Sequence, residues 1–241
     1  MRQLLLATLL VVGACAEASK PSFGGHTDGG VIMLVDGDVH QPPPPDAFVS
    51  HVDAPPNMMT KTLDQNSSDT IKLNTAITCR NNTTGYTTAT SYFRVFDPGT
   101  TTDFHVTTVG FQVENCQGSA GNGQVVTVKV GTYNGGVGAS SLSTANMATL
   151  ATNAAVQVPE VAEVAASVNA PIMATIPAGQ KMFVEIDSPA NNSTVFMGVN
   201  TATETAPGYI LAPDCNVNVP TNYSTAVGTQ NSLLLTVTGT Y

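Results

Sequence analysis

The sequence predicts an all-β fold: an antiparallel β-sandwich over residues 65–241, with a jelly roll as the preferred topology, preceded by a disordered linker. Three observations favour this class. Short segments alternate apolar and polar residues with a period of two, which is typical of strands buried on one face. Clusters of Gly, Pro and Asn separate these segments, and no sustained helical pattern appears. Many short strands joined by polar turns indicate two packed sheets.

The alternation is clearest in residues 124–133, where Val126, Val128 and Val130 are expected to face inward and Lys129 to face solvent. The remaining strands are expected over residues 91–97, 103–115, 148–158, 172–176, 182–187, 194–200, 208–211 and 232–240.

Two segments depart from a simple strand pattern. Within 103–115 the alternation of apolar and polar residues shifts by one position, which predicts a bulge near Thr107 and Thr108. Such a bulge would bend the strand and let it take part in both sheets. Between Pro159 and Pro171 the apolar residues, such as Val161 and Val168, follow helical spacing. We therefore expect a short helix at most, or an irregular connection, in that interval.

The amino terminus carries an export signal. Arg2 gives a positive start, and residues 4–12 form an apolar run too short to span a bilayer. The run ends in Val12-Gly13-Ala14-Cys15, which resembles the bacterial lipobox. The resemblance implies that residues 1–14 are a signal peptide and that Cys15 carries lipid, palmitate included. An ordinary signal peptide with an incidental cysteine is the alternative. Ala16 stands where an aspartate would resemble the inner-membrane retention signal, so the resemblance favours the outer membrane.

Residues 15–64 are expected to form a flexible tether. The segment contains four consecutive prolines at 42–45, two glycine pairs, and no Lys or Arg between Lys20 and Lys61. Asp36-Gly37-Asp38 has the oxygen ligands that calcium prefers. However, Ala47 occupies the position where an EF-hand loop would place its glutamate, so we interpret the segment as an acidic, solvated linker.

Composition excludes several classes of function. With 17 acidic and 8 basic side chains the formal net charge is −9, which disfavours nucleic acid as a partner. Three of the four histidines lie in the linker, leaving only His105 in the domain. A zinc site is therefore not expected, and no cofactor or other metal is predicted. No Gly-x-Ser-x-Gly motif accompanies His105 to suggest a serine hydrolase.

Paired carboxylates are the remaining route to catalysis. Glu185 and Asp187 share one face of their strand, and Glu114 and Glu204 are possible partners. Nothing distinguishes them from carboxylates on solvated strands, and the chain has no Trp for stacking on sugars. We expect the protein not to be an enzyme, with a carboxylate-based polysaccharide hydrolase as the alternative.

Arg94 lies on one face of its strand with Tyr92 and Phe96. A guanidinium in that place either recognises an acidic ligand or pairs with a carboxylate inside the fold. We expect the internal pair, because an arginine between core aromatics usually fixes a fold.

If Cys15 is lipidated, three cysteines remain, which are Cys79, Cys116 and Cys215. One disulfide and one spare thiol are therefore expected among them. The residues alone leave the three pairings open. Segments 77–79, 91–97, 109–114 and 209–215 together resemble a repeated, uncharacterised β-sandwich module of secreted bacterial proteins. That resemblance implies a disulfide between Cys79 and Cys215, with Cys116 spare, and it implies no activity.

These observations combine into one expectation of function. The chain is expected to be an exported protein, lipid-anchored at the outer membrane or cell surface, whose domain is a noncatalytic binding or adhesion module for glycan or protein partners. A structural envelope or coat component is the alternative.

Overall fold

The computed structural model describes residues 58–162 and 164–241, so the expected signal peptide, Cys15 and most of the expected linker lie outside the described residues. The elements are, in chain order, β1 (Thr60–Leu63), β2 (Thr90–Phe96), β3 (Phe104–Gln117), β4 (Gln124–Tyr133), η1 (Thr144–Asn146), β5 (Met147–Val158), β6 (Ala166–Ile176), β7 (Lys181–Ser188), β8 (Thr194–Met197), β9 (Val199–Asn200), β10 (Gly208–Ala212), η2 (Pro213–Cys215), β11 (Val217–Asn222), α1 (Tyr223–Val227), β12 (Ser232–Leu233) and β13 (Leu235–Thr240).

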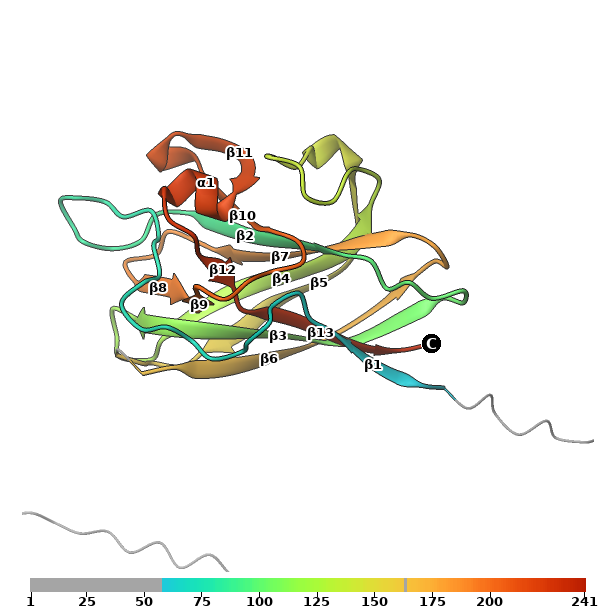
Figure 1. Ribbon diagram of the computed structural model, residues 1–241. Coiled ribbons are helices and arrows are strands. Elements are labelled where there is room, and N and C mark those ends of the chain that lie inside the picture. The colour runs from blue at the N-terminus through green and yellow to red at the C-terminus, as the bar shows by residue number, and fades with distance from the viewer. Residues whose placement is uncertain (1–57, 163) are drawn as a thin grey trace, which may run out of the picture. The chain divides into compact units, whose positions relative to one another are not determined.

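Two antiparallel sheets pack face to face (Figure 1). The first sheet has the order β1-β13-β3-β6, and β8 pairs with the last part of β3, beyond the reach of β13. The second sheet has the order β11-β10-β2-β7-β4-β5. Strands β9 and β12 pair with each other as a separate two-stranded sheet, within the segment of chain between β7 and β13.

Eight of these strands have the jelly-roll order. The rows β1-β13-β3-β6 and β2-β7-β4-β5 face each other, and successive strands change sheet except at the β4–β5 hairpin. The segment from β8 to β12 is inserted between β7 and β13 and adds β10 and β11 beside β2. The structure thus confirms the predicted all-β sandwich and its jelly-roll topology.

Strand β2 is buried along its whole length because apolar clusters cover both of its faces. Tyr92 and Phe96 point into the core between the two sheets. Side chains of β4 and β7 belong to the same core. The opposite face packs into a second cluster of Phe93, Val95, Tyr133, Leu142, Phe183 and Tyr209. Each fully buried side chain of this size stabilises the fold by roughly 1.5–3 kcal/mol, so β2 is a central anchor of the domain.

Strand β3 contains the predicted bulge, which appears as a register shift between Val106 and Thr108 against β6. A matching shift lies between Thr238 and Gly239 of β13. The expectation that this strand serves both sheets is wrong. All of its partners, β13, β6 and β8, belong to the first sheet, so the bulge only returns the apolar residues to the inner face.

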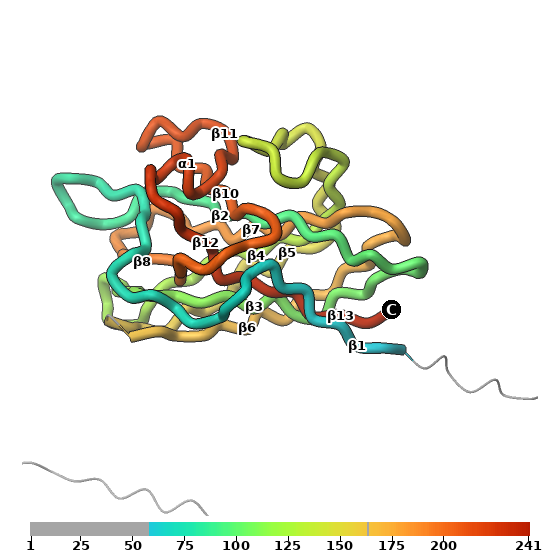
Figure 2. Tube along the Cα trace, viewed as in Figure 1, coloured from blue at the N-terminus to red at the C-terminus, as the bar shows by residue number. Residues whose placement is uncertain are grey.

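The sandwich begins earlier than residue 65. Leu63 is buried and pairs with Val237, so β1 joins the first sheet beside the end of the chain (Figure 2). The predicted linker, ending at residue 64, therefore includes a strand of the domain. A four-residue strand with one inward apolar residue has too weak a pattern to be recognised without its partner β13.

The helical spacing after Pro159 is also misleading. The described residues between Pro159 and Ala165 form no helix, which agrees with the expected irregular connection, but Val168 is a buried residue of β6 and pairs with Phe111. The strand expected over 172–176 thus begins at Ala166, because pairing with β3 overrides the local pattern.

A disulfide joins Cys79, which precedes β2, to Cys215 in η2, as the resemblance implied. Its sulfurs close a loop with a sequence separation of 136 residues. In the chain-entropy model a loop of this length stabilises the fold by on the order of 5 kcal/mol.

Candidate functional site

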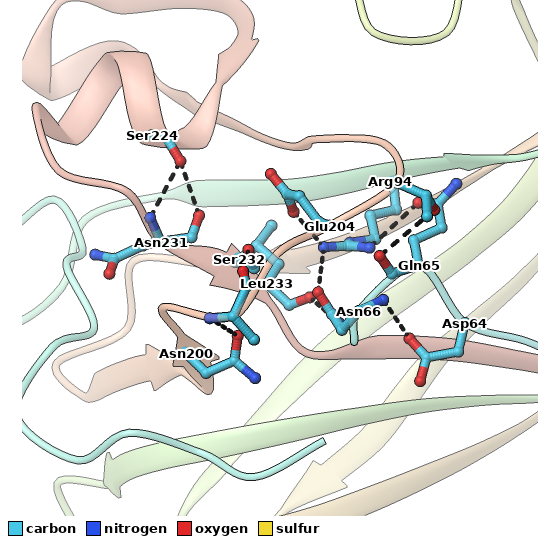
Figure 3. Close-up of polar contacts among 12 residues, drawn as sticks. Asp64, Gln65, Asn66, Arg94, Asn200, Glu204, Ser224, Asn231, Ser232 and Leu233 are labelled. Carbon is cyan, nitrogen blue, oxygen red and sulfur yellow. Dashed lines mark hydrogen bonds and ion pairs between the residues drawn. The ribbon is translucent and has the colours of Figure 1, made fainter. Parts of the chain in front are cut away.

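Arg94 is fully buried and lies in a polar cluster with Gln65, Asn66 and Glu204 (Figure 3). Its Nη2 donates to Glu204 Oε2 at 2.6 Å and to Asn66 Oδ1 at 3.0 Å, and its Nη1 donates to Gln65 Oε1 at 3.2 Å. Burial lowers the pKa of Arg94 and raises the pKa of Glu204, while their mutual attraction opposes both shifts. The expected internal ion pair is confirmed, so this guanidinium is a structural group.

The carboxylates considered for catalysis have separate structural partners. Glu185 accepts from Lys129 Nζ at 3.1 Å, and Asp187 accepts from Ser91 Oγ at 3.1 Å. Glu114 is buried and accepts backbone N–H groups of residues 74 and 76 at 2.7 and 3.2 Å, which holds the segment before β2 against β3.

The ring of His105 is hydrogen-bonded through Nδ1 to Thr175 Oγ1 at 3.1 Å on the outer face of the first sheet. No group of three or more metal-binding side chains gathers within residues 58–162 and 164–241.

The outer face of the first sheet carries a small hollow over Gly110. The hollow encloses about 160 Å³, the space of roughly five water molecules. Its polar lining consists of Asp69, Gln112, Ser167, Asn169 and Thr236. We call this set, with its glycine floor, the Gly110 hollow.

The hollow exists because three strands place a glycine between two short polar side chains. In the sheet register Gly110 of β3 lies between Thr236 of β13 and Asn169 of β6. A Cβ at residue 110 would come within 2.7 Å of Thr236 Oγ1 and 3.4 Å of Asn169 Oδ1. Any larger residue would therefore fill the space.

Most polar groups of the hollow are available to a ligand. Ser167 and Asn169 are exposed and Thr236 is half-buried. None of the three makes a side-chain hydrogen bond to another residue in the part of the chain that the structure describes. Gln112 is fixed, because its Nε2 donates to the backbone carbonyl of Asp69 at 2.6 Å. The hollow thus offers hydroxyl and amide groups of both donor and acceptor character on a rigid sheet.

Asp69 supplies the carboxyl group of the hollow. A side-chain hydrogen bond with Asp64 raises the pKa of Asp69, and partial burial and repulsion from Asp64 act in the same direction. Asp69 therefore keeps its proton to a higher pH than an isolated aspartate does. Asp64 does not line the hollow and belongs instead to the lining of a larger cleft.

Sequence reasoning could not find this site. Asp69, Gly110, Asn169 and Thr236 come from distant parts of the chain, and only the strand register brings them together. In the expected strand 232–240 the period-two pattern places Thr236 and Thr238 opposite the apolar residues, on the solvent face, which is the only local signal.

The predicted lipidation site, Cys15, lies outside the described residues. Cys116 is unpaired among the described cysteines and fully buried, which agrees with its expected role as the spare thiol. No helix within the described residues is long and apolar enough to cross a membrane.

No protein-family model matches the chain, and no curated protein matches its sequence. One similar structure contains the cysteine protease and lectin-like domains of Cwp84, a surface layer associated protein of Clostridium difficile. It has 13% identity and a TM-score of 0.43, and the match covers 64% of this chain and 32% of that one.

A second structure is the clostridial cysteine protease Cwp84 after propeptide cleavage, with 13% identity and a TM-score of 0.49. That match covers 75% of this chain and 40% of the other, so this chain spans less than half the length of either neighbour. The class of the domain, a disulfide-linked jelly-roll sandwich, is defined by its own strand order.

Proposed function

We propose that the protein is a noncatalytic binding module that recognises a sugar ring of a neutral glycan in the Gly110 hollow. The observation that carries the proposal is the glycine-floored hollow itself, lined by free hydroxyl and amide groups on the outer face of a rigid sheet. Sugar hydroxyls donate and accept hydrogen bonds, and Ser167, Asn169 and Thr236 offer both kinds of partner. The small volume suits one ring, and weak affinity is expected because Phe111, the aromatic residue of the lining, is buried and offers no face for stacking.

The three glutamates considered for catalysis support a binding role over a hydrolytic one. A glycosidase needs an acid and a second carboxylate facing one bond. Glu114, Glu185 and Glu204 are each engaged in holding the fold, through backbone N–H groups, Lys129 and Arg94 respectively.

The edges of the sheets support a discrete module over a coat built by sheet extension. The edge strand β6 contains Pro171, which cannot donate to a further strand, and β5 has two register shifts against β4. Both features hinder pairing between sheet edges of different molecules.

The module is proposed to act outside the cytoplasm at the end of a lipid-anchored tether. The Cys79–Cys215 disulfide suits an oxidising compartment, and the lipobox-like Val12-Gly13-Ala14-Cys15 supplies the anchor. Metabolic labelling with a palmitate analogue should mark the protein and not its Cys15→Ser variant. Equal labelling of both, or none of either, would contradict the anchor without affecting the ligand proposal.

Glycan-array screening followed by calorimetry with the purified protein tests the ligand proposal. Neutral glycans should bind, and Gly110→Val, which fills the hollow, should abolish that binding. Thr175→Val on the same sheet face is the matched control and should bind normally. Absence of neutral-glycan binding, or equal binding by Gly110→Val, would refute the proposal, and capture of a defined protein partner instead would favour protein recognition.

A further inference from the structure

A second, larger cleft shares no lining residue with the Gly110 hollow. It encloses about 730 Å³ where β1, the end of β2, the segment after β4 and the start of β7 meet. The polar side chains of the cleft include Lys61, Asp64, Gln65, Asp97, Lys181 and Thr205. We call this the lysine cleft. Its volume falls in the range of about 300–1,000 Å³ that is common for small-molecule sites.

Positive charge is scarce in this protein, and two of its cations line this cleft beside two aspartates. The described residues contain six Lys and Arg side chains, of which Arg94 and Lys129 are in ion pairs. Two of the remaining four, Lys61 and Lys181, line the lysine cleft. Within residues 58–162 and 164–241 neither Lys61 nor Lys181 forms an ion pair with a carboxylate, and on a chain of net charge −9 two such cations in one cleft mark a place for an anion.

Each of these ammonium groups is positioned but not neutralised. Lys61 Nζ donates to the carbonyl oxygen of Pro98 at 2.6 Å, and Lys181 Nζ donates to that of Gly135 at 3.2 Å. A carbonyl oxygen carries no full charge, and an ammonium group has three donors. Each lysine therefore keeps hydrogen-bond donors and its full charge for a ligand.

The acidic residues of the cleft are held in local turns. Asp64 Oδ1 accepts from the backbone N–H of Asn66 at 2.8 Å, and Asp97 Oδ1 accepts from that of Gly99 at 2.9 Å. Neither forms an ion pair with Lys61 or Lys181. Their remaining oxygens can accept hydrogen bonds from ligand hydroxyls.

The back of the cleft is rigid. Gln65 is fixed from both ends, since its Nε2 donates to the carbonyl oxygen of Val95 at 2.7 Å and its Oε1 accepts from Arg94. Arg94 is in turn held by Glu204, so the buried ion pair orients a residue that lines the cleft (Figure 3). Such a preorganised wall lowers the entropy lost when a ligand binds.

We propose that the lysine cleft binds a carboxylate-bearing sugar unit, as found in uronate-containing glycans. Lys61 and Lys181 face the carboxylate, while Asp64, Asp97, Gln65 and Thr205 receive the hydroxyl groups. The combination of two cations with hydroxyl acceptors favours an acidic sugar over an acidic peptide, which lacks those hydroxyls. This site is separate from the Gly110 hollow and does not depend on the function proposed for it.

The test is calorimetry of the purified protein with oligogalacturonate, its methyl-esterified form and polyglutamate. Oligogalacturonate should bind at least tenfold more tightly than the ester, and polyglutamate should not bind. Lys61→Gln with Lys181→Gln should weaken oligogalacturonate binding by roughly tenfold, a factor within the reach of two partly exposed charge contacts. Raising the salt concentration should weaken it as well.

Two matched controls separate this site from general charge and from the hollow. Lys72→Gln, at an exposed lysine outside both sites, and Asn169→Ala, in the Gly110 hollow, should leave oligogalacturonate binding unchanged. Equal affinity for acid and ester, an effect of Lys72→Gln equal to that of the cleft variants, or binding of polyglutamate would each overturn the proposal.

Discussion

Arg94 Nη2 lies 2.6 Å from Glu204 Oε2, which joins the central strand β2 to the loop before β10 through a pair of charges inside the fold. The arginine side chain is 0% exposed and the glutamate side chain 17% exposed. Breaking such a pair leaves one charge uncompensated, whereas replacing both partners with apolar groups is often tolerated.

Arg94→Met should therefore lower the free energy of unfolding by about 3–5 kcal/mol, because Glu204 is left without its cation. The double variant Arg94→Met, Glu204→Leu should regain most of that loss. Urea unfolding of both variants and of Glu204→Leu closes the double-mutant cycle. An Arg94→Met loss below about 1 kcal/mol would mean that the pair does not hold the fold.

The disulfide between Cys79 and Cys215 should be the largest covalent contribution to stability. Replacing both cysteines with serine should reduce the free energy of unfolding by on the order of 5 kcal/mol, less any relief of strain. Chemical unfolding with and without reductant measures this, and reductant should not affect the double variant. Equal stability of the wild-type protein under both conditions would contradict the prediction.

Cys116 should be inert in the folded protein. Burial raises the pKa of its thiol to about 11, and repulsion from Glu160 adds to the effect. Since the thiolate is the reactive form, a thiol reagent at pH 8 should label Cys116 only after unfolding. Rapid labelling of the native protein, with Cys116→Ala as the blank, would show that this part of the core opens readily.

Asp69 should titrate above its ordinary pKa of 3.8, because it is hydrogen-bonded to Asp64. The folded protein then binds this proton more tightly than the unfolded chain does, so this group favours the fold increasingly as the pH falls through the raised pKa. The gain levels off once the unfolded chain is protonated too. Carboxyl NMR titration should show the raised pKa, and Asp64→Asn should return it toward 3.8. An unchanged titration in Asp64→Asn would disprove the coupling.

The sequence predicted the sandwich because most of its strands carry the pattern on their own. Strand β4 has the predicted bounds, and Val126, Val128 and Val130 are buried. Where the pattern was weak, as in β1, or coincided with a helical period, as near Val168, only the partner strand decides the structure.

The candidate site was less accessible from sequence. Arg94 drew attention because it stands among core aromatics, and its role was predicted correctly, yet the Gly110 hollow has no local signal. It depends on the register of β3 with β13 and β6, which places Thr236 and Asn169 on either side of one glycine. Such long-range register is not encoded in the pattern of any single strand.

Mapping of backbone amide NMR shifts during titration with a neutral oligosaccharide tests the central claim most directly. The account predicts that the shifts gather at Gly110, Gln112, Ser167, Asn169 and Thr236 and disappear in Gly110→Val. Shifts that gather elsewhere on the domain, or no shifts at ligand concentrations in the millimolar range, would contradict it.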